Sequence, residues 1–209
     1  IPEDSIYVSL CGAHYKNDKP IKGELGHLIE SGLIQPHQYF GIDREKEIID
    51  QNRIFYPDNN WINGDFLEVL ENIIMNNSNI AVINYDGVMQ PRNSTQYLKK
   101  IMTLVDYNID HELMLIVNFV LTNPYINSTK LDFSIHDALK ELKDLYWMPN
   151  HWHLYPESYL YTHSKATMGV LIFLKEKHDI KDIKYSLNRK IGCIGESEIQ
   201  QVFECDEEV

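Results

Sequence analysis

The sequence predicts an α/β fold in which a doubly wound, mostly parallel sheet of seven strands carries helices on both faces. Two observations support this fold class. Short β-branched and apolar runs alternate with segments of helical periodicity from residue 6 to residue 145, which is typical of a parallel sheet with helical crossovers. The chain then changes to two neighbouring strand-like segments, residues 152–162 and 167–174, whose short connection predicts a C-terminal antiparallel hairpin.

Buried strands and helices are expected in strict alternation before this hairpin. Apolar runs without polar alternation indicate strands buried on both faces, at residues 6–10, 39–42, 61–63, 80–83 and 113–120. Caps and helical spacing predict helices from Gly23 to Gly32, over residues 44–53, from the cap Asp65 to residue 74, from a cap at Asn93 or Ser94 to residue 105, and around residues 138–145.

One domain over residues 1–190 is expected, followed by an acidic C-terminal tail of residues 191–209. A chain of 209 residues is long enough for one sizeable core. Its formal charge of −12, from 31 acidic and 19 basic residues, argues against a broad basic surface for nucleic acid. Six of the acids lie in the tail, which has no Lys or Arg: Glu196, Glu198, Glu204, Asp206, Glu207 and Glu208.

The sequence indicates a soluble, cytoplasmic protein. Its three cysteines, Cys11, Cys193 and Cys205, are too scattered for a disulfide framework and lack the paired spacing of a zinc site. No stretch approaches the roughly twenty apolar residues of a membrane span, and the first residues lack the pattern of a secretory signal. We therefore expect a reducing compartment, no metal and no membrane contact.

Two acidic residues mark the carboxyl ends of neighbouring expected strands. Asp43 follows the run of residues 39–42, and Asp65 follows Gly64 after the run of residues 61–63. Because ligands of open parallel sheets bind beyond the carboxyl ends of the strands, both carboxylates should face one crevice. A carboxylate there can accept hydrogen bonds from both hydroxyls of a ribose, so the residues indicate a nucleoside-sized site. The structural alternative is two capping aspartates on an ordinary α/β domain.

The stretch from Tyr39 to Leu67 resembles the nucleoside-binding half of class I methyltransferases that use S-adenosylmethionine. In that family an acid after the second strand holds the ribose, and a Gly-Asp-Phe-like turn after the third strand faces the adenine. The resemblance extends from about Ile6 to Lys175 and implies S-adenosylmethionine as the cofactor. It implies cofactor contacts at the loop after the first strand and at the next strand ends: Leu10, Cys11, Gly12, Ala13, His14, Asp43, Arg44, Gly64, Asp65, Phe66 and Asn84.

The loop after the first strand departs from the family pattern. The family has an acid near this strand end and then several glycines, because close backbone approach to the methionine part of the cofactor leaves no room for side chains. Here Ser9 stands in place of the acid, and Gly12 is the first glycine, well before Gly23 and Gly26. These two later glycines are candidates for the missing close approach.

The fourth expected strand ends in residues that the family places beside the transferred methyl group. These catalytic candidates are Asn84, Tyr85 and Asp86, and Asp86 is the first candidate for a base or a substrate anchor. The alternative is that Asp86 is only a turn acid. We expect the acceptor over the ends of the first, fourth and fifth strands, near His14, Asp86 and Asn118.

The resemblance implies transfer of a methyl group to an acceptor that the sequence does not identify. The acidic body favours a small molecule or a protein over duplex nucleic acid. One alternative is a catalytically silent module that binds a nucleoside or a partner, because the glycine loop is reduced. Another is a nucleotide-using doubly wound enzyme, although a phosphate loop with Lys and Ser or Thr is lacking. His151 and His153 can share one face of a strand as metal ligands, but no third ligand is close in sequence.

Overall fold

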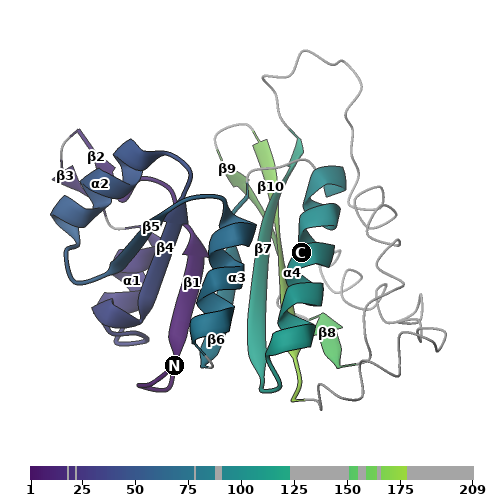
Figure 1. Cartoon of the computed structure of the whole chain (residues 1–209). Helices are drawn as coiled ribbons and strands as arrows, with labels where there is room; N and C mark the ends of the chain where they lie inside the picture. The colour runs from purple at the N-terminus through teal and green to yellow at the C-terminus, as the bar shows by residue number, and fades with distance from the viewer. Residues whose placement is uncertain are drawn as a thin grey trace.

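The computed structural model describes residues 1–17, 19–21, 23–77, 79–87, 91–122, 151–154, 159–163 and 166–177 (Figure 1). Strands and helices alternate as the sequence predicts: β1 (Ile6–Leu10), β2 (Tyr15–Lys16), β3 (Lys19–Pro20), α1 (Glu24–Glu30), the 3-10 helix η1 (Pro36–Gln38), β4 (Tyr39–Asp43), α2 (Lys46–Phe55), β5 (Asn60–Asn63), α3 (Phe66–Asn76), β6 (Ile80–Tyr85), α4 (Pro91–Asn108) and β7 (Leu113–Thr122). Three further strands are β8 (Trp152–Leu154), β9 (Tyr159–His163) and β10 (Ala166–Lys175). The helix expected around residues 138–145 and the tail of residues 191–209 lie outside the described residues.

The described strands form one large sheet in the order β5-β4-β1-β6-β7-β10-β8, and β9 also pairs with β10. The strands from β5 to β7 are mutually parallel, whereas β10 is antiparallel to β7, β8 and β9. Because β8 and β9 pair with successive stretches of β10, the sheet has seven positions. The doubly wound, mostly parallel sheet with a C-terminal antiparallel hairpin is thus confirmed. The chain winds outward from β1 in both directions, which creates the switch point where such sheets bind ligands.

Three local features differ from the sequence-based expectations. Residues 152–162, expected as one strand, include β8 and all of β9 except its last residue. Helix α4 begins at Pro91 and not after a cap at Asn93 or Ser94, because the ring of proline presets φ and its missing N–H is not needed at the first helical position. The hairpin of β2 and β3 was not expected, since strands of two residues are too short to show periodicity.

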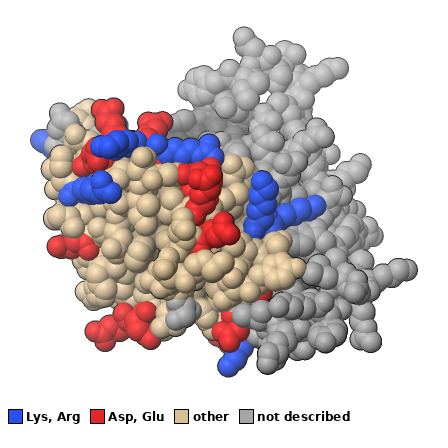
Figure 2. All heavy atoms as spheres, in the orientation of Figure 1, with Lys and Arg blue, Asp and Glu red and all other residues tan. Residues whose placement is uncertain are grey.

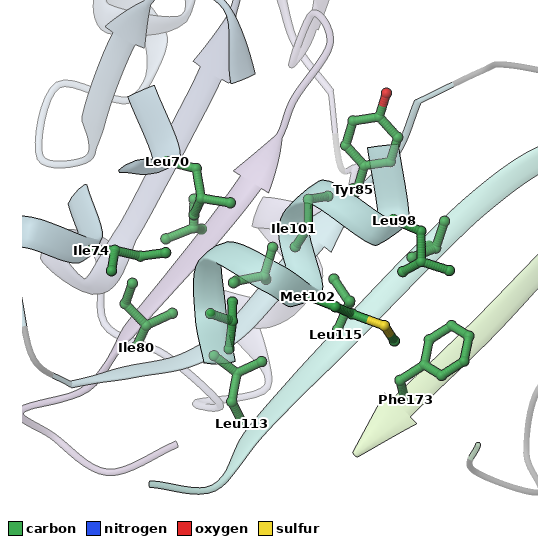
Figure 3. Packing of buried hydrophobic residues seen from close by; sticks show 14 of the residues in the cluster. Leu70, Ile74, Ile80, Tyr85, Leu98, Ile101, Met102, Leu113, Leu115 and Phe173 are labelled. Atoms are coloured by element: carbon green, nitrogen blue, oxygen red, sulfur yellow. The ribbon is translucent and has the colours of Figure 1, made fainter. Parts of the chain in front are cut away.

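The main core lies between the sheet and the helices α3 and α4, which cover the near face of the sheet in Figure 1. Figure 3 shows side chains of both helices packed over those of the strands: Leu70, Ile74, Leu98, Ile101 and Met102 from the helices, and Ile80, Leu113, Leu115 and Phe173 from the strands. Full burial of an aliphatic or aromatic side chain stabilises the fold by about 1.5–3 kcal/mol. Phe173 belongs to β10, so the C-terminal hairpin is held by this core as well as by strand pairing.

A second core covers the opposite face of the sheet, under α1 and α2. Leu25 of α1 and Ile49 of α2 are both fully buried against Tyr39, Trp61 and their neighbours on the strands. The rings of Tyr39 and Trp61 lie 5.6 Å apart in an edge-to-face arrangement. Gly41 of β4 lies opposite Trp61 of β5. Because glycine has no side chain, it leaves the space that the indole ring of Trp61 fills.

A buried polar cluster attaches β8 to the end of α4. Asp106 of α4 accepts a hydrogen bond from Trp152 Nε1 at 2.7 Å, and its Oδ1 lies 2.9 Å from His151 Nε2. Lys175 is 2% exposed and donates to the carbonyl of His111 at 2.8 Å. Burial lowers the pKa of the Lys175 ammonium to about 8. The cluster lies at the amino ends of the parallel strands, away from the switch point, and therefore has a structural role.

The two histidines considered as metal ligands contact different carboxylates. His151 contacts Asp106, whereas His153 Nε2 lies 3.3 Å from Glu176 Oε1. Within the described part of the chain, no group of three or more His, Cys, Asp or Glu side chains is arranged to hold a metal ion. Among the helices of these same residues, none combines the length and the apolar character needed to cross a membrane.

We predict that Gly41→Ala lowers the free energy of unfolding by about 1–3 kcal/mol, because extra atoms in a filled core force their neighbours out of position. A Cβ at Gly41 would lie 2.5 Å from Cε3 of Trp61. Gly12→Ala is the matched control, because a Cβ there meets no atom within 4 Å. Urea unfolding followed by circular dichroism measures the difference. Equal unfolding free energies for the two variants would show that the space beside Gly41 is not filled.

Candidate functional site

The carboxyl ends of β4, β1 and β6 bring most of the predicted site residues to one edge of the sheet, at the upper end of the strands in Figure 1. Parallel register places Asp43 opposite Asn63 of β5 and Ser9 opposite Asn84 of β6. Polar side chains from four neighbouring strands therefore lie side by side along this edge. This alignment is a consequence of parallel pairing, in which every strand ends at the same edge.

Asn52 of α2 holds the loop that follows β1. Its fully buried amide donates to the carbonyl of Gly12 at 3.1 Å and accepts from the backbone N–H of His14 at 2.9 Å. Cys11 extends the pairing of β1, since its backbone N–H donates to the carbonyl of Ile42 at 3.0 Å. Burial raises the pKa of the Cys11 thiol, which keeps it protonated and unreactive. The backbone of residues 10–14 is thus fixed beside the strand ends.

The ring of His14 does not face the acceptor region, where the sequence analysis placed it. The residue is 6% exposed, and its ring packs against Tyr39, Tyr56 and Trp61 with centroid distances of 6.1, 6.1 and 5.5 Å. Gly23 lies beside the same ring, and a Cβ at this position would be in ordinary van der Waals contact with His14 Nδ1 at 3.4 Å. Burial lowers the pKa of His14 to about 4, so the ring is neutral at pH 7. Its backbone belongs to the site loop, but its side chain belongs to the core.

Asp43 ends β4 with one carboxylate oxygen engaged. Its Oδ1 accepts the backbone N–H of Glu45 at 2.8 Å, a turn that leads into α2. The other oxygen, Oδ2, has no hydrogen-bond partner among the described residues. The amide of Asn63 donates to the carbonyls of Asp43 at 3.0 Å and Arg44 at 2.8 Å, which fixes the backbone here. Asp43 therefore offers an ionised acceptor on a rigid support, as a hydroxyl-bearing ligand requires.

Asp65 has both a structural and an electrostatic partner. Its Oδ1 caps α3 by accepting the backbone N–H groups of Leu67 at 2.9 Å and Glu68 at 3.4 Å. Its Oδ2 forms an ion pair with Arg44, whose guanidinium also donates to Tyr97 at 3.3 Å. Desolvation by itself raises the pKa of Asp65. The hydrogen bonds from Arg44 and from the backbone of α3 together outweigh this effect, so the pKa is lowered overall. Since the Arg44 side chain is 65% exposed, the ion pair is weak and a ligand can displace it.

Tyr85, which the sequence analysis placed beside the substrate, is a core residue. It is 1% exposed, and its ring stacks on Tyr97 at 5.5 Å and lies 5.2 Å from the ring of Phe66. Burial raises the pKa of its hydroxyl, which argues against a role as a base at neutral pH. Phe66, predicted to contact the cofactor, is likewise buried in this stack. The alternation of β6 places Asn84 on the opposite face of the sheet from Tyr85.

Glu24 reaches the site, although the sequence analysis did not single it out. It is the first residue of α1, and its carboxylate accepts hydrogen bonds from Tyr7 Oη, from Asn84 Nδ2 and from Ser9 Oγ at 3.1 Å. Desolvation raises the pKa of Glu24, and these hydrogen bonds oppose the shift. One signal in the sequence was available: Tyr7 and Ser9 alternate on one face of a buried strand, and buried hydroxyls require partners.

Asp86 follows the end of β6, and Asn118 lies within the neighbouring strand β7. Their side chains are in contact. Desolvation raises the pKa of Asp86 even though part of its side chain remains exposed, and a hydrogen bond from Asn118 lowers it in part. These are two of the three residues expected around the acceptor. A half-desolvated carboxylate with an oriented partner can hold a polar group or accept a proton.

The strand-end edge is negatively charged in its interior and mixed at its rim. Asp43, Glu24 and Asp86 all lie near the switch point, and the charge of Asp86 contributes to the raised pKa of Glu24. Figure 2 shows Lys and Arg side chains interspersed with Asp and Glu along the upper edge of this face. Such a field favours a ligand that carries a positive group, because opposite charges attract strongly where water is partly excluded.

The structure is similar to solved structures of methyltransferases. Sp1610 of Streptococcus pneumoniae, a proposed tRNA (m1A22) methyltransferase, matches with a TM-score of 0.51 and 12% identity over 98% of this chain and 90% of that chain. An O-methyltransferase of Bacillus cereus in complex with S-adenosylhomocysteine matches with a TM-score of 0.50 and 13% identity over 83% and 74%. LepI, in complex with S-adenosylhomocysteine and a substrate analogue, matches with a TM-score of 0.50 and 14% identity over 83% and 44%. No protein-family model and no curated protein matches the sequence.

The chain therefore has the class I methyltransferase fold, as the sequence predicted. At 12–14% identity this similarity defines the fold, and the residues at the strand ends have to carry the functional argument.

We predict that His14 makes the protein less stable in acid. Its pKa is about 4 in the folded protein and about 6.5 when unfolded, so the unfolded chain takes up the proton first as the pH falls. Between pH 8 and pH 5, His14 should therefore remove about 2 kcal/mol from the free energy of unfolding. Urea unfolding of wild type and His14→Phe at both pH values measures this contribution. If the free energy of unfolding falls equally in both proteins between the two pH values, His14 is not buried in its neutral form.

Proposed function

We propose that this protein transfers a methyl group from S-adenosylmethionine to an acceptor that is not yet identified. The observation that carries this proposal is the available carboxylate oxygen of Asp43 at the end of β4, beside the switch point of a class I methyltransferase fold. An ionised carboxylate can accept hydrogen bonds from both hydroxyls of a ribose. The B. cereus O-methyltransferase of similar fold binds S-adenosylhomocysteine, which supports a ligand of this class.

The described residues fit this cofactor at four places. Asp43 would hold the ribose, and the fixed backbone around Gly12 would lie along the methionine part, where a Cβ meets no atom within 4 Å. The adenine would lie near Asp65, where its amino group would compete with Arg44 for the carboxylate. Asn84 has a buried Oδ1 without a hydrogen-bond partner among the described residues, and such an atom favours a ligand that can donate to it.

The cofactor, when bound, supplies a methyl group on a positively charged sulfur that a nucleophile can attack. The chain contributes mainly alignment, because an acceptor held in line with this methyl group reacts without further loss of orientational freedom. Asp86 and Asn118 are placed to orient the acceptor beyond β6 and β7. Asp86 would also accept the proton of an acceptor that has to lose one, and its raised pKa makes it a stronger base than a fully solvated aspartate.

We propose a small molecule or a protein as the acceptor in preference to duplex nucleic acid. The formal charge is −12, and basic and acidic side chains are mixed on the face that Figure 2 shows. A second candidate function is a catalytically silent binding module. The short loop after β1 favours it, because Gly12 is the only glycine among residues 10–14.

Calorimetric titration with S-adenosylmethionine, S-adenosylhomocysteine, NAD and ATP tests the proposed cofactor. We expect the first two ligands to bind and the last two to show no heat of binding, because the described residues offer no cradle for phosphates. Incubation of candidate acceptors with labelled S-adenosylmethionine then separates an enzyme from a silent module. Binding of NAD or ATP alone would reject the methyltransferase assignment.

We predict that Asp43→Ala weakens the binding of S-adenosylhomocysteine by at least about tenfold, since each charge-assisted hydrogen bond contributes about 1.5–3 kcal/mol. Asp43→Asn should be intermediate, because its amide keeps the shape but accepts through one oxygen only. Asp58→Ala, in an exposed turn after α2, is the control. Calorimetry with all four proteins gives the affinities, and melting curves show that each is folded. An Asp43→Ala protein that binds as tightly as wild type would reduce Asp43 to a turn residue.

A further inference from the structure

We infer that Glu24 and Asn84 form a subsite for a primary ammonium group, which in the bound cofactor is that of its amino-acid part. This inference rests on the proposed function, and it assigns a residue of α1 to a contact that the sequence analysis did not assign. The subsite lies between the ends of β1 and β6, on the face of the sheet that α1 covers.

The first observation is an uncompensated charge. All three donors to the Glu24 carboxylate, Tyr7, Ser9 and Asn84, are neutral groups. No Lys, Arg or His side chain forms a salt bridge with Glu24 within the described residues. A carboxylate withdrawn from water without a counter-ion is costly, and the nearby charge of Asp86 adds to the repulsion. An ammonium group would remove this cost more completely than any neutral ligand group.

The second observation concerns the buried amide of Asn84. This residue is 6% exposed, and its Nδ2 donates to Glu24. The orientation of the amide follows from the ionised carboxylate beside it, which accepts hydrogen bonds but cannot donate them. Its Oδ1 is consequently a buried acceptor without a donor among the described residues. Such an atom loses a hydrogen bond that it had in water, and an ammonium group has three N–H donors to offer.

The Glu24 carboxylate has room for a fourth hydrogen-bond donor. An ionised carboxylate has about four acceptor sites, of which Glu24 uses three. Glu24 is only half-buried, so a ligand arriving at the strand-end edge can reach it. An ammonium group there would take the remaining acceptor site of Glu24 and supply a donor near Asn84.

The position also agrees with the size of the ligand. Asp43, proposed to hold the ribose, ends β4, and β1 separates this strand from β6. Two strand spacings amount to roughly 10 Å, so the nucleoside and the amino-acid chain would extend along the sheet edge from Asp43 towards Glu24. Ser9, near the end of β1, carries no charge and donates to Glu24 at 3.1 Å. The helix α1 thus returns a carboxylate to a place where the strand has none.

A binding cycle between protein and ligand tests this subsite without using activity. The proteins are wild type, Glu24→Gln and Glu30→Gln, and the last removes the same charge from the exposed far end of α1. The ligands are S-adenosylhomocysteine and its desamino analogue, in which hydrogen replaces the ammonium group. Calorimetry gives the six affinities, and melting curves confirm that each protein is folded.

We expect Glu24→Gln to lower the affinity for S-adenosylhomocysteine about tenfold and the affinity for its desamino analogue less than twofold. Only the first ligand carries the ammonium group that Glu24 attracts. Glu30→Gln should bind both ligands as wild type does. If Glu24→Gln does not fold, the wild-type comparison decides, since the desamino analogue should then bind about tenfold more weakly than S-adenosylhomocysteine.

Other results overturn the inference in ways that can be told apart. If folded Glu24→Gln loses affinity equally for both ligands, or for neither, Glu24 is a structural residue and the proposed function is unaffected. Equal binding of both ligands to wild type has the same meaning. A wild-type protein that binds neither ligand rejects the proposed cofactor together with this subsite.

Discussion

The parallel pairing of β1 with β4 on one side and β6 on the other is the constraint on which the rest of the structure depends. Parallel strands cannot be joined by tight turns, so α1, α2 and α3 must return the chain to the same end of the sheet each time. Their arrangement creates two helical layers and one switch point. The same pairing places Ser9, Asp43 and Asn84 close together at the carboxyl ends of their strands. The fold and the candidate site therefore have a common physical origin.

The two faces of the sheet have different compositions, and this difference separates stability from binding. The face under α3 and α4 carries an almost entirely apolar core, which holds β7 and the C-terminal hairpin as well. The face under α1 and α2 combines apolar packing with buried polar groups, among them Ser9, His14, Asn52 and Asn84. Buried polar groups are tolerated when they are hydrogen-bonded, and the apolar face offsets their cost. The candidate site is therefore built where polar groups are concentrated.

Several residues at the strand ends serve both the fold and the candidate site. Asp65 caps α3 with one oxygen and pairs with Arg44 through the other, and Asp43 forms the turn into α2 while its second oxygen remains available. Such double use keeps a functional group rigid, because its backbone and half of its hydrogen-bonding capacity are fixed by secondary structure. The exposed Arg44 is the adaptable part of this edge, since its ion pair with Asp65 is weak in water.

The sequence by itself determined the doubly wound sheet, the C-terminal hairpin and the strand-end positions of Asp43, Asp65, Asn84 and Asp86. These features follow from local periodicity and from the rule that parallel strands end at one edge, and both can be recognised in a linear chain. Only the tertiary structure decided the side chains that meet across elements. Glu24 lies 15 residues from Ser9 and 60 from Asn84, and their contact forms only when α1 packs on β1 and β6. Likewise, the His14 ring lies in a core built by β4, β5 and α2, because burial among aromatic rings is decided by packing and leaves no periodic signal.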